Sequence, residues 1–174
     1  MTRSVPDPAA QDVLPLGLSA DEIDALLEAR MIANLASINP NGTVHLVAMW
    51  FRREGDAILM PTSSHTRKGK NLRRHPQATV MIDQSRAGLD LRGVQIKGSV
   101  ELVDGPEARR LNRAIHERYV TPLGLAQAEV AAYLGTGDDL TVRVAIERMT
   151  SWNLADGPAG RALRASGHVH PLDP

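Results

Sequence analysis

Short runs that are wholly apolar, or in which apolar and polar residues alternate, recur along the chain and predict six strands. The first two, Met31–Ile38 and Val44–Arg52, flank the turn Asn39-Pro40-Asn41-Gly42, whose Asn-Gly pair favours the positive φ angles of a tight hairpin. The other four predicted strands are Ala57–Met60, Ala78–Ile82, Leu91–Val103 with a bend at Gly98, and Leu140–Trp152. Short antiparallel strands joined by turns favour a small barrel, because a closed barrel leaves no exposed strand edges.

Local patterns outside these strands predict helices. Ser19 and Glu22 form a capping-box pattern that predicts a helix ending near Arg30. Apolar residues at helical spacing predict a second helix over 107–119 and another over 125–134. The predicted fold is therefore mainly β with flanking helices. A dinucleotide-binding sheet is excluded, because strands and long helices do not alternate and no Gly-x-Gly-x-x-Gly follows a strand.

Composition limits the organisation and the partners. The 174 residues suit one domain, which we place at 19–156, between a Pro-containing flexible arm at 1–18 and a Gly-, Pro- and Ala-rich tail at 157–174. Twenty basic and twenty acidic residues balance, so an extended nucleic-acid surface is not expected. Apolar runs are too short for a membrane span, and a chain without cysteine or a targeting pattern favours the cytoplasm.

Basic residues concentrate in one segment, Thr62–Pro76, which follows the third predicted strand and contains no acid. The hydroxyls of Thr62 and Ser63 come first, and the cations follow where a short helix should begin. The five cations are Arg67, Lys68, Lys70, Arg73 and Arg74. Hydroxyls, cations and free N–H groups at a helix start bind phosphate, although such a run is also typical of a solvated helix face. A small phosphorylated ligand is the first hypothesis.

Four motifs together resemble the split β-barrel superfamily of pyridoxamine 5'-phosphate oxidase-like flavin and deazaflavin oxidoreductases, over about residues 20–155. The motifs are Leu35–Gly42, His45–Phe51, Thr62 with Arg67–Leu72, and Arg92–Gly98. The resemblance implies a six-stranded antiparallel split barrel of the FMN-binding type, which forms a homodimer with its cofactor at the subunit interface. It also implies that the phosphate of the cofactor lies on the start of the basic helix.

Two substitutions bear on which cofactor is bound. FMN-binding oxidases of this superfamily carry an Arg at the start and a Lys at the end of the second strand, where this chain has His45 and Trp50. The pair Trp50-Phe51 and the closing segment Met149–Trp152 look like the branch that uses the deazaflavin coenzyme F-420. The resemblance therefore favours coenzyme F-420, with FMN as the alternative.

The resemblance also assigns roles to individual residues. Val47, Ala48 and Met49 would flank the ring with backbone groups, and Trp50 would form a wall on the substrate side, whereas Phe51 is expected in the core. The phosphate would bind to Arg67 and Lys68, with Thr62, Ser63 and Asn71 nearby. Redox chemistry would come from the coenzyme. No proton donor is identified, because His45 is more simply explained as an outward-facing structural histidine.

Three functional classes follow. The first is an oxidoreductase that uses reduced coenzyme F-420 to transfer hydride to a small unsaturated substrate such as an enone, a quinone or a tetrapyrrole-like molecule. The second is an FMN-dependent oxidoreductase, and the third is a non-catalytic binder of a cofactor or a haem-type ligand. No metal site is predicted, because His168 and His170 have strand spacing but no third ligand near them.

Overall fold

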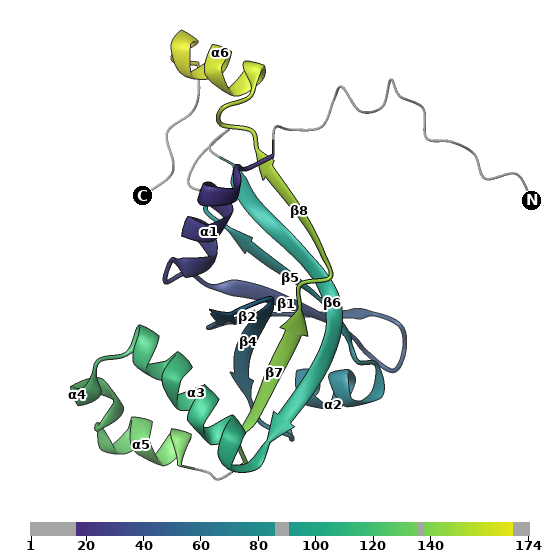
Figure 1. The fold of residues 1–174 in the computed structure, drawn as a ribbon, viewed down its shortest axis with the longest axis vertical. Coiled ribbons are helices and arrows are strands. Elements are labelled where there is room, and N and C mark those ends of the chain that lie inside the picture. The colour runs from purple at the N-terminus through teal and green to yellow at the C-terminus, as the bar shows by residue number, and fades with distance from the viewer. Residues whose placement is uncertain (1–16, 86–90, 136–137, 169–174) are drawn as a thin grey trace, which may run out of the picture.

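A curled antiparallel sheet forms the body of the protein (Figure 1). The computed structural model describes residues 17–85, 91–135 and 138–168. Of the arm predicted at 1–18, residues 1–16 lie outside these ranges. The strands are β1 Ala33–Ile38, β2 Val44–Met49, β3 Arg52–Glu54, β4 Ala57–Thr62, β5 Gln77–Asp83, β6 Arg92–Asp104, β7 Leu140–Ala145 and β8 Arg148–Asn153. They run in the order β2-β1-β5-β6-β7-β4-β3, and β8 also pairs with β6. This curled half-barrel confirms the predicted mainly β fold with flanking helices and fits the expected split barrel.

The described residues form eight strands rather than the predicted six, because two predicted strands are each broken in two. The predicted strand 44–52 becomes β2 and β3, which separate at Trp50 and Phe51; β2 pairs with β1, whereas β3 pairs with β4. The predicted strand 140–152 becomes β7 and β8, which separate at Ile146 and Glu147. Each break lets one stretch of chain pass from one part of the curled sheet to another.

Gly98 explains the second break. A Cβ at this position would lie 1.8 Å from the carbonyl oxygen of Ala145, so only glycine permits the close approach of the two backbones. Before this point β6 pairs with β8, and after it β6 pairs with β7. Glu147 accepts hydrogen bonds from the amide and the hydroxyl of Ser99 and so holds the crossing. The bend predicted at Gly98 is the place where β6 changes partners.

The first hairpin differs from its prediction. Gly42 has a φ of +82°, but no residue other than glycine has a positive φ among the described residues, so Asn41 does not adopt the expected conformation. The amide of Asn39 donates to the carbonyl of Thr43 at 2.9 Å, and the side chain of Asn41 accepts from the hydroxyl of Thr43 at 2.7 Å. The hairpin is a wider loop that side chains close.

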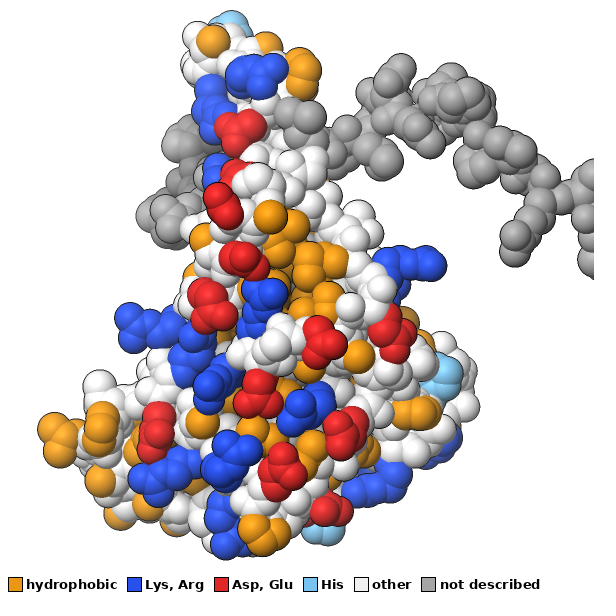
Figure 2. All heavy atoms as spheres, in the orientation of Figure 1, with side chains coloured by type: hydrophobic (Ala, Val, Ile, Leu, Met, Phe, Trp, Pro, Cys, Tyr) orange, Lys and Arg blue, Asp and Glu red, His pale blue; other side chains and the backbone are white. Residues whose placement is uncertain are grey.

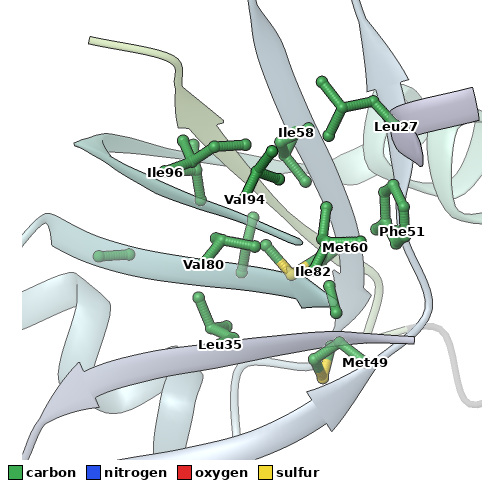
Figure 3. Packing of buried hydrophobic residues seen from close by; sticks show 14 of the residues in the cluster. Leu27, Leu35, Met49, Phe51, Ile58, Met60, Val80, Ile82, Val94 and Ile96 are labelled. Carbon is green, nitrogen blue, oxygen red and sulfur yellow. The ribbon is translucent and has the colours of Figure 1, made fainter. Parts of the chain in front are cut away.

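The main hydrophobic core lies inside the curl of the sheet (Figure 3). Alternate residues of β1, β5 and β6 point inwards, as their period-two burial predicts. Phe51, which is fully buried, enters this core from the break between β2 and β3, and its predicted core position is confirmed. Helix α1, Ala20–Glu28, starts with the predicted capping box at Ser19 and covers the core with Leu26 and Leu27.

Helix α3, Gly105–Tyr119, packs on the outside of the sheet through Ala108, Leu111 and Ile115, which form a second cluster with Leu59. The predicted helix 125–134 is two short ones, α4 Pro122–Leu125 and α5 Ala128–Leu134, which return beside α3 (Figure 1). The remaining helices are α2 Arg67–Arg74 and α6 Pro158–Ser166, the latter within the segment expected as a tail.

Candidate cofactor site

The turn from β4 into α2 is held on both sides by hydrogen bonds. The hydroxyl of Thr66 caps α2 by accepting from the amide of Gly69 at 3.1 Å, and it donates to the carbonyl of Ser63 at 2.9 Å. The hydroxyl of Thr62 lies 3.0 Å from that of Thr66. On the other side, Asp138 accepts from the amide and hydroxyl of Ser64 at 3.0 and 3.1 Å. The turn is therefore fixed in place before any ligand arrives.

Gly69 brings the first turn of α2 against this loop. A Cβ at position 69 would lie 2.7 Å from the carbonyl oxygen of Ser63, a distance that real Cβ atoms do not reach. The glycine is buried, and Leu72, one turn of the helix later, is fully buried in the main core. Glycine and leucine together fix how deeply α2 sits in the molecule.

The cations of α2 are unpaired. Arg67, Lys70, Arg73 and Arg74 are exposed, Lys68 is half-buried, and none of the five makes an ion pair within the described residues. The first turn of α2 contains no acid. Burial lowers the pKa of Lys68, because desolvation disfavours its charged form. An anion beside this ammonium would offset that penalty.

Further donors surround the same turn. The hydroxyl of Ser63 has no hydrogen-bond partner among the described residues, and the amides of Arg67 and Lys68 belong to the first helical turn, which has no carbonyl of its own helix to bond. The partial positive charge of the helix start adds to the side-chain charges. Thr62, Ser63, Arg67 and Lys68 thus lie around the same helix start, and their role in binding an anion stays a prediction.

Asn71 is placed differently from the other predicted residues. It is only 1% exposed, and its amide donates to the hydroxyl of Ser37 at 3.2 Å and to the side-chain oxygen of Asn39 at 3.0 Å. Its own side-chain oxygen is buried without a donor in the described part of the chain. Asn71 faces the protein interior and ties α2 to β1 and to the first hairpin.

Strand β2 carries the residues predicted to flank a ring. It lies at one end of the strand order and, among the described strands, pairs with β1 alone, so its outer edge leaves alternate N–H and C=O groups without a strand partner there. Val47 and Met49 point towards the core, and Ala48 points outwards. Side chains two residues apart on a strand point to the same face, and Met49 at the end of β2 is buried. His45 therefore lies on the inward face with Val47, and the prediction that it points outwards is wrong.

The outward face of this hairpin is apolar. Val44 is 61% exposed and Leu46 is 62% exposed, and Ile38 pairs with Val44 from the adjacent strand. Exposed aliphatic residues next to each other on a sheet are typical of a surface that another molecule covers. The apolar face defined by Ile38, Val44 and Leu46 therefore lies on the strand predicted to flank the ring.

Trp50 directly follows β2 and packs on α3. Its ring stacks on Tyr119, with centroids 5.1 Å apart and planes at 4°, and its centroid lies 5.9 Å from that of His116, edge to face. The hydroxyl of Tyr119 donates to the carbonyl of Met31 at 2.7 Å and accepts from the amide of Phe51 at 3.2 Å. Tyr119 and His116 were missed from sequence, although Tyr119 was one of only two tyrosines.

No three metal-ligating side chains gather within residues 17–85, 91–135 and 138–168; His170, one of the two candidate histidines, lies outside these ranges. None of the helices in the described part has the length and apolar character needed to span a membrane.

Residues 19–153 match the pyridoxamine 5'-phosphate oxidase family. The solved structure of the conserved hypothetical protein Rv2991 from Mycobacterium tuberculosis is 27% identical in sequence to this chain, with a TM-score of 0.68. The match covers 93% of this chain and 95% of Rv2991. An F420 reductase is 24% identical, with 72% and 94% coverage and a TM-score of 0.58. The haem storage protein HutZ from Vibrio cholerae is 16% identical, with 78% and 96% coverage and a TM-score of 0.61.

No curated protein matches the chain. The resemblance described from the sequence is confirmed: the chain belongs to the pyridoxamine 5'-phosphate oxidase family, on a fold that an F420 reductase and a haem storage protein share.

Proposed function

We propose that this protein is an oxidoreductase that uses reduced coenzyme F-420 to transfer hydride to a small unsaturated organic substrate, such as an enone, a quinone or a tetrapyrrole-like molecule. The observation that supports it most is the unpaired cationic first turn of α2, built around Arg67 and Lys68. Reduced coenzyme F-420 supplies the hydride when it is bound. The tasks of the protein are to bind, to orient the ring and to exclude water.

The charge pattern of α2 suits an elongated anion. Arg67 and Lys68 lie at the helix start, beside the free hydroxyl of Ser63, and each charge-assisted hydrogen bond there contributes about 1.5–3 kcal/mol when partly desolvated. Lys70, Arg73 and Arg74 continue the positive charge along the helix. Coenzyme F-420 has a phosphodiester and a glutamate tail, so it presents several negative charges that this arrangement can hold.

The ring would lie along the free edge of β2. Backbone groups of Val47, Ala48 and Met49 at this edge would hydrogen-bond the polar edge of the ring, and Trp50 would bound the substrate side. His45 and Trp50 supply no permanent positive charge at the ends of β2. This feature favours the deazaflavin over FMN. Asn71 would act indirectly, by holding α2 against β1.

A second copy of the chain completes the proposed site. The apolar face of Ile38, Val44 and Leu46 is exposed in a single chain, and burying it against a partner would remove apolar area from water. A homodimer with the cofactor at the subunit interface fits this position. The edge of β2 would then be covered by the partner and closed to water.

The discriminating experiment is to mix the purified protein with coenzyme F-420 and, separately, with FMN, and to measure by gel filtration and fluorescence titration which is retained. Retention of coenzyme F-420 together with hydride transfer to an enone or quinone is expected. Retention of FMN instead would establish the FMN-dependent alternative.

A non-catalytic binder is the second alternative, favoured by the similarity to a haem storage protein. Tight retention of a cofactor or of haem, without hydride transfer to any acceptor, would overturn the proposed enzyme activity.

A further inference from the structure

A pocket lies between α3 and the short helices α4 and α5. Its volume is about 540 Å³, within the range of pockets that hold small organic ligands. In Figure 1 these helices and α2 lie on either side of β7, and no residue of α2 lines the pocket. We infer that this pocket binds a neutral, mostly apolar ring compound that carries one hydrogen-bonding group. The inference holds whether or not a coenzyme binds at α2.

One wall of the pocket is apolar. It comes from α4, α5 and the residues next to them, namely Pro122, Leu125, Ala126, Ala131 and Leu134. Hydrophobic side chains also project where Figure 1 places α4, at the lower left of Figure 2. An apolar ring between this wall and α3 would be removed from water on its larger faces, which is the main driving force for binding such a ligand.

The opposite wall is polar but carries no excess charge. Nε of Arg109 lies 3.4 Å from a carboxylate oxygen of Asp139, and Nε of Arg113 lies 2.8 Å from a carboxylate oxygen of Glu117. Each cation that lines the pocket thus has its own acid, and Figure 2 shows acidic and basic side chains intermixed over the lower part of the molecule. An anionic ligand would have to displace a carboxylate, in contrast to the unpaired cations of α2. A neutral ligand meets no such cost.

The buried amide of the polar wall is already satisfied. Asn112 is 3% exposed and donates to the carboxylate of Asp139 at 3.0 Å and to the carbonyl of Leu140 at 3.4 Å. Its oxygen accepts from the hydroxyl of Thr141 at 2.8 Å. Asn112 therefore shapes the floor of the pocket and has little capacity left for a ligand.

His116 is the group that remains for recognition. Its ring is half-buried, lines the pocket and makes no hydrogen bond within the described residues. Burial lowers its pKa, an effect that the negative charge of Asp139 opposes, so the neutral imidazole is favoured. Neutral imidazole offers one donor and one acceptor. Arg109, Arg113 and Glu117 are the other charged residues of α3 that line the pocket.

Trp50 gives the pocket an optical reporter, because its ring packs edge to face on His116. The probe is N-phenyl-1-naphthylamine, a neutral fused ring with one N–H group, whose emission rises in apolar surroundings and which accepts energy from tryptophan. Saturable binding of one probe per chain is expected. In the variant Trp152→Phe, energy transfer should persist, because Trp50 is then the only tryptophan. In the unmodified protein, the rise in the emission of the probe itself measures the same binding curve.

Two comparisons test the location and the charge of the site. Ala131→Phe fills the pocket and should weaken binding at least tenfold, whereas Ala132→Phe, its exposed neighbour outside the lining, should change it less than twofold. The sulfonated analogue 8-anilinonaphthalene-1-sulfonate should bind at least tenfold more weakly than the neutral probe. Absence of saturable binding, equal effects of the two alanine variants, or tighter binding of the sulfonate would each overturn the inference.

Discussion

Trp50 stacks on Tyr119 with ring centroids 5.1 Å apart and planes only 4° from parallel, so the end of the edge strand β2 rests on the last turn of α3. The hydroxyl of the same tyrosine bonds to the backbone of Met31 and Phe51. One side chain from α3 thus holds both ends of the chain segment that contains β1 and β2. A substitution at Tyr119 should therefore also change the position of β2 at the candidate cofactor site.

Tyr119→Phe keeps the stacked ring but removes these backbone hydrogen bonds. The buried amide of Phe51 then loses its acceptor, and we expect the free energy of unfolding to fall by about 1–3 kcal/mol. Urea denaturation measures this change. Tyr133→Phe is the matched control, because Tyr133 is 80% exposed, and it should leave stability unchanged. Equal effects of the two substitutions would contradict the anchoring role of Tyr119.

Lys68→Ala should weaken binding of coenzyme F-420 at least several-fold, because it removes a half-buried cation from the helix start. Fluorescence titration measures the affinity, and circular dichroism checks that the fold is intact. Arg74→Ala removes an exposed cation from the other end of α2 and should weaken binding less than Lys68→Ala does. If both variants bind the coenzyme as well as the unmodified protein does, the phosphate assignment is wrong.

Leu46→Glu should dissociate the proposed homodimer, because it places a charge in the apolar face of β2. Sedimentation velocity would show a monomer, and affinity for the coenzyme should fall with it. Leu123→Glu is the control, since Leu123 is 81% exposed on α4. If the unmodified protein already sediments as a monomer, the proposed interface is wrong.

Gly98→Ala should disrupt the place where β6 changes partners. The added Cβ would lie 1.8 Å from the carbonyl oxygen of Ala145, and the backbones must separate to admit it. Overpacking of this kind costs about 1–3 kcal/mol and sometimes more. Thermal unfolding would show the loss, and Lys97→Ala, an exposed neighbour on β6, should show almost none.

Stability should fall in mild acid, partly because of His116. Burial lowers the pKa of His116 in the folded state below its ordinary value of 6.5. The unfolded chain therefore takes up the proton first as the pH drops through that value, and folding then loses free energy until the folded pKa is passed. His116→Phe should remove this contribution. Denaturation at pH 7.5 and pH 5.0 should show a smaller loss for the variant than for the unmodified protein, and equal losses would contradict the assignment.

Local pattern by itself determined much of this protein. Alternation and short apolar runs located most of the strands, because at least one face of each strand must be buried, and the capping box at Ser19 placed the first helix. Of β3, only Arg52 was predicted. The absence of acids from Thr62–Pro76 identified the candidate anion site, and the structure brings its hydroxyls and cations to one helix start. These features depend on neighbours in sequence, which are visible without the fold.

Tertiary structure decided what depends on residues far apart in the chain. Whether 44–52 and 140–152 are each one strand or two depends on which partners each half meets, and the contact of Gly98 with Ala145 cannot be read from either segment alone. The inward position of Asn71 depends on Ser37 and Asn39, and the place of Trp50 depends on Tyr119. The pocket beside His116 exists only because α4 and α5 fold back on α3. Periodicity shows that a side chain will be buried, but only the packing of the folded chain shows which residues it contacts.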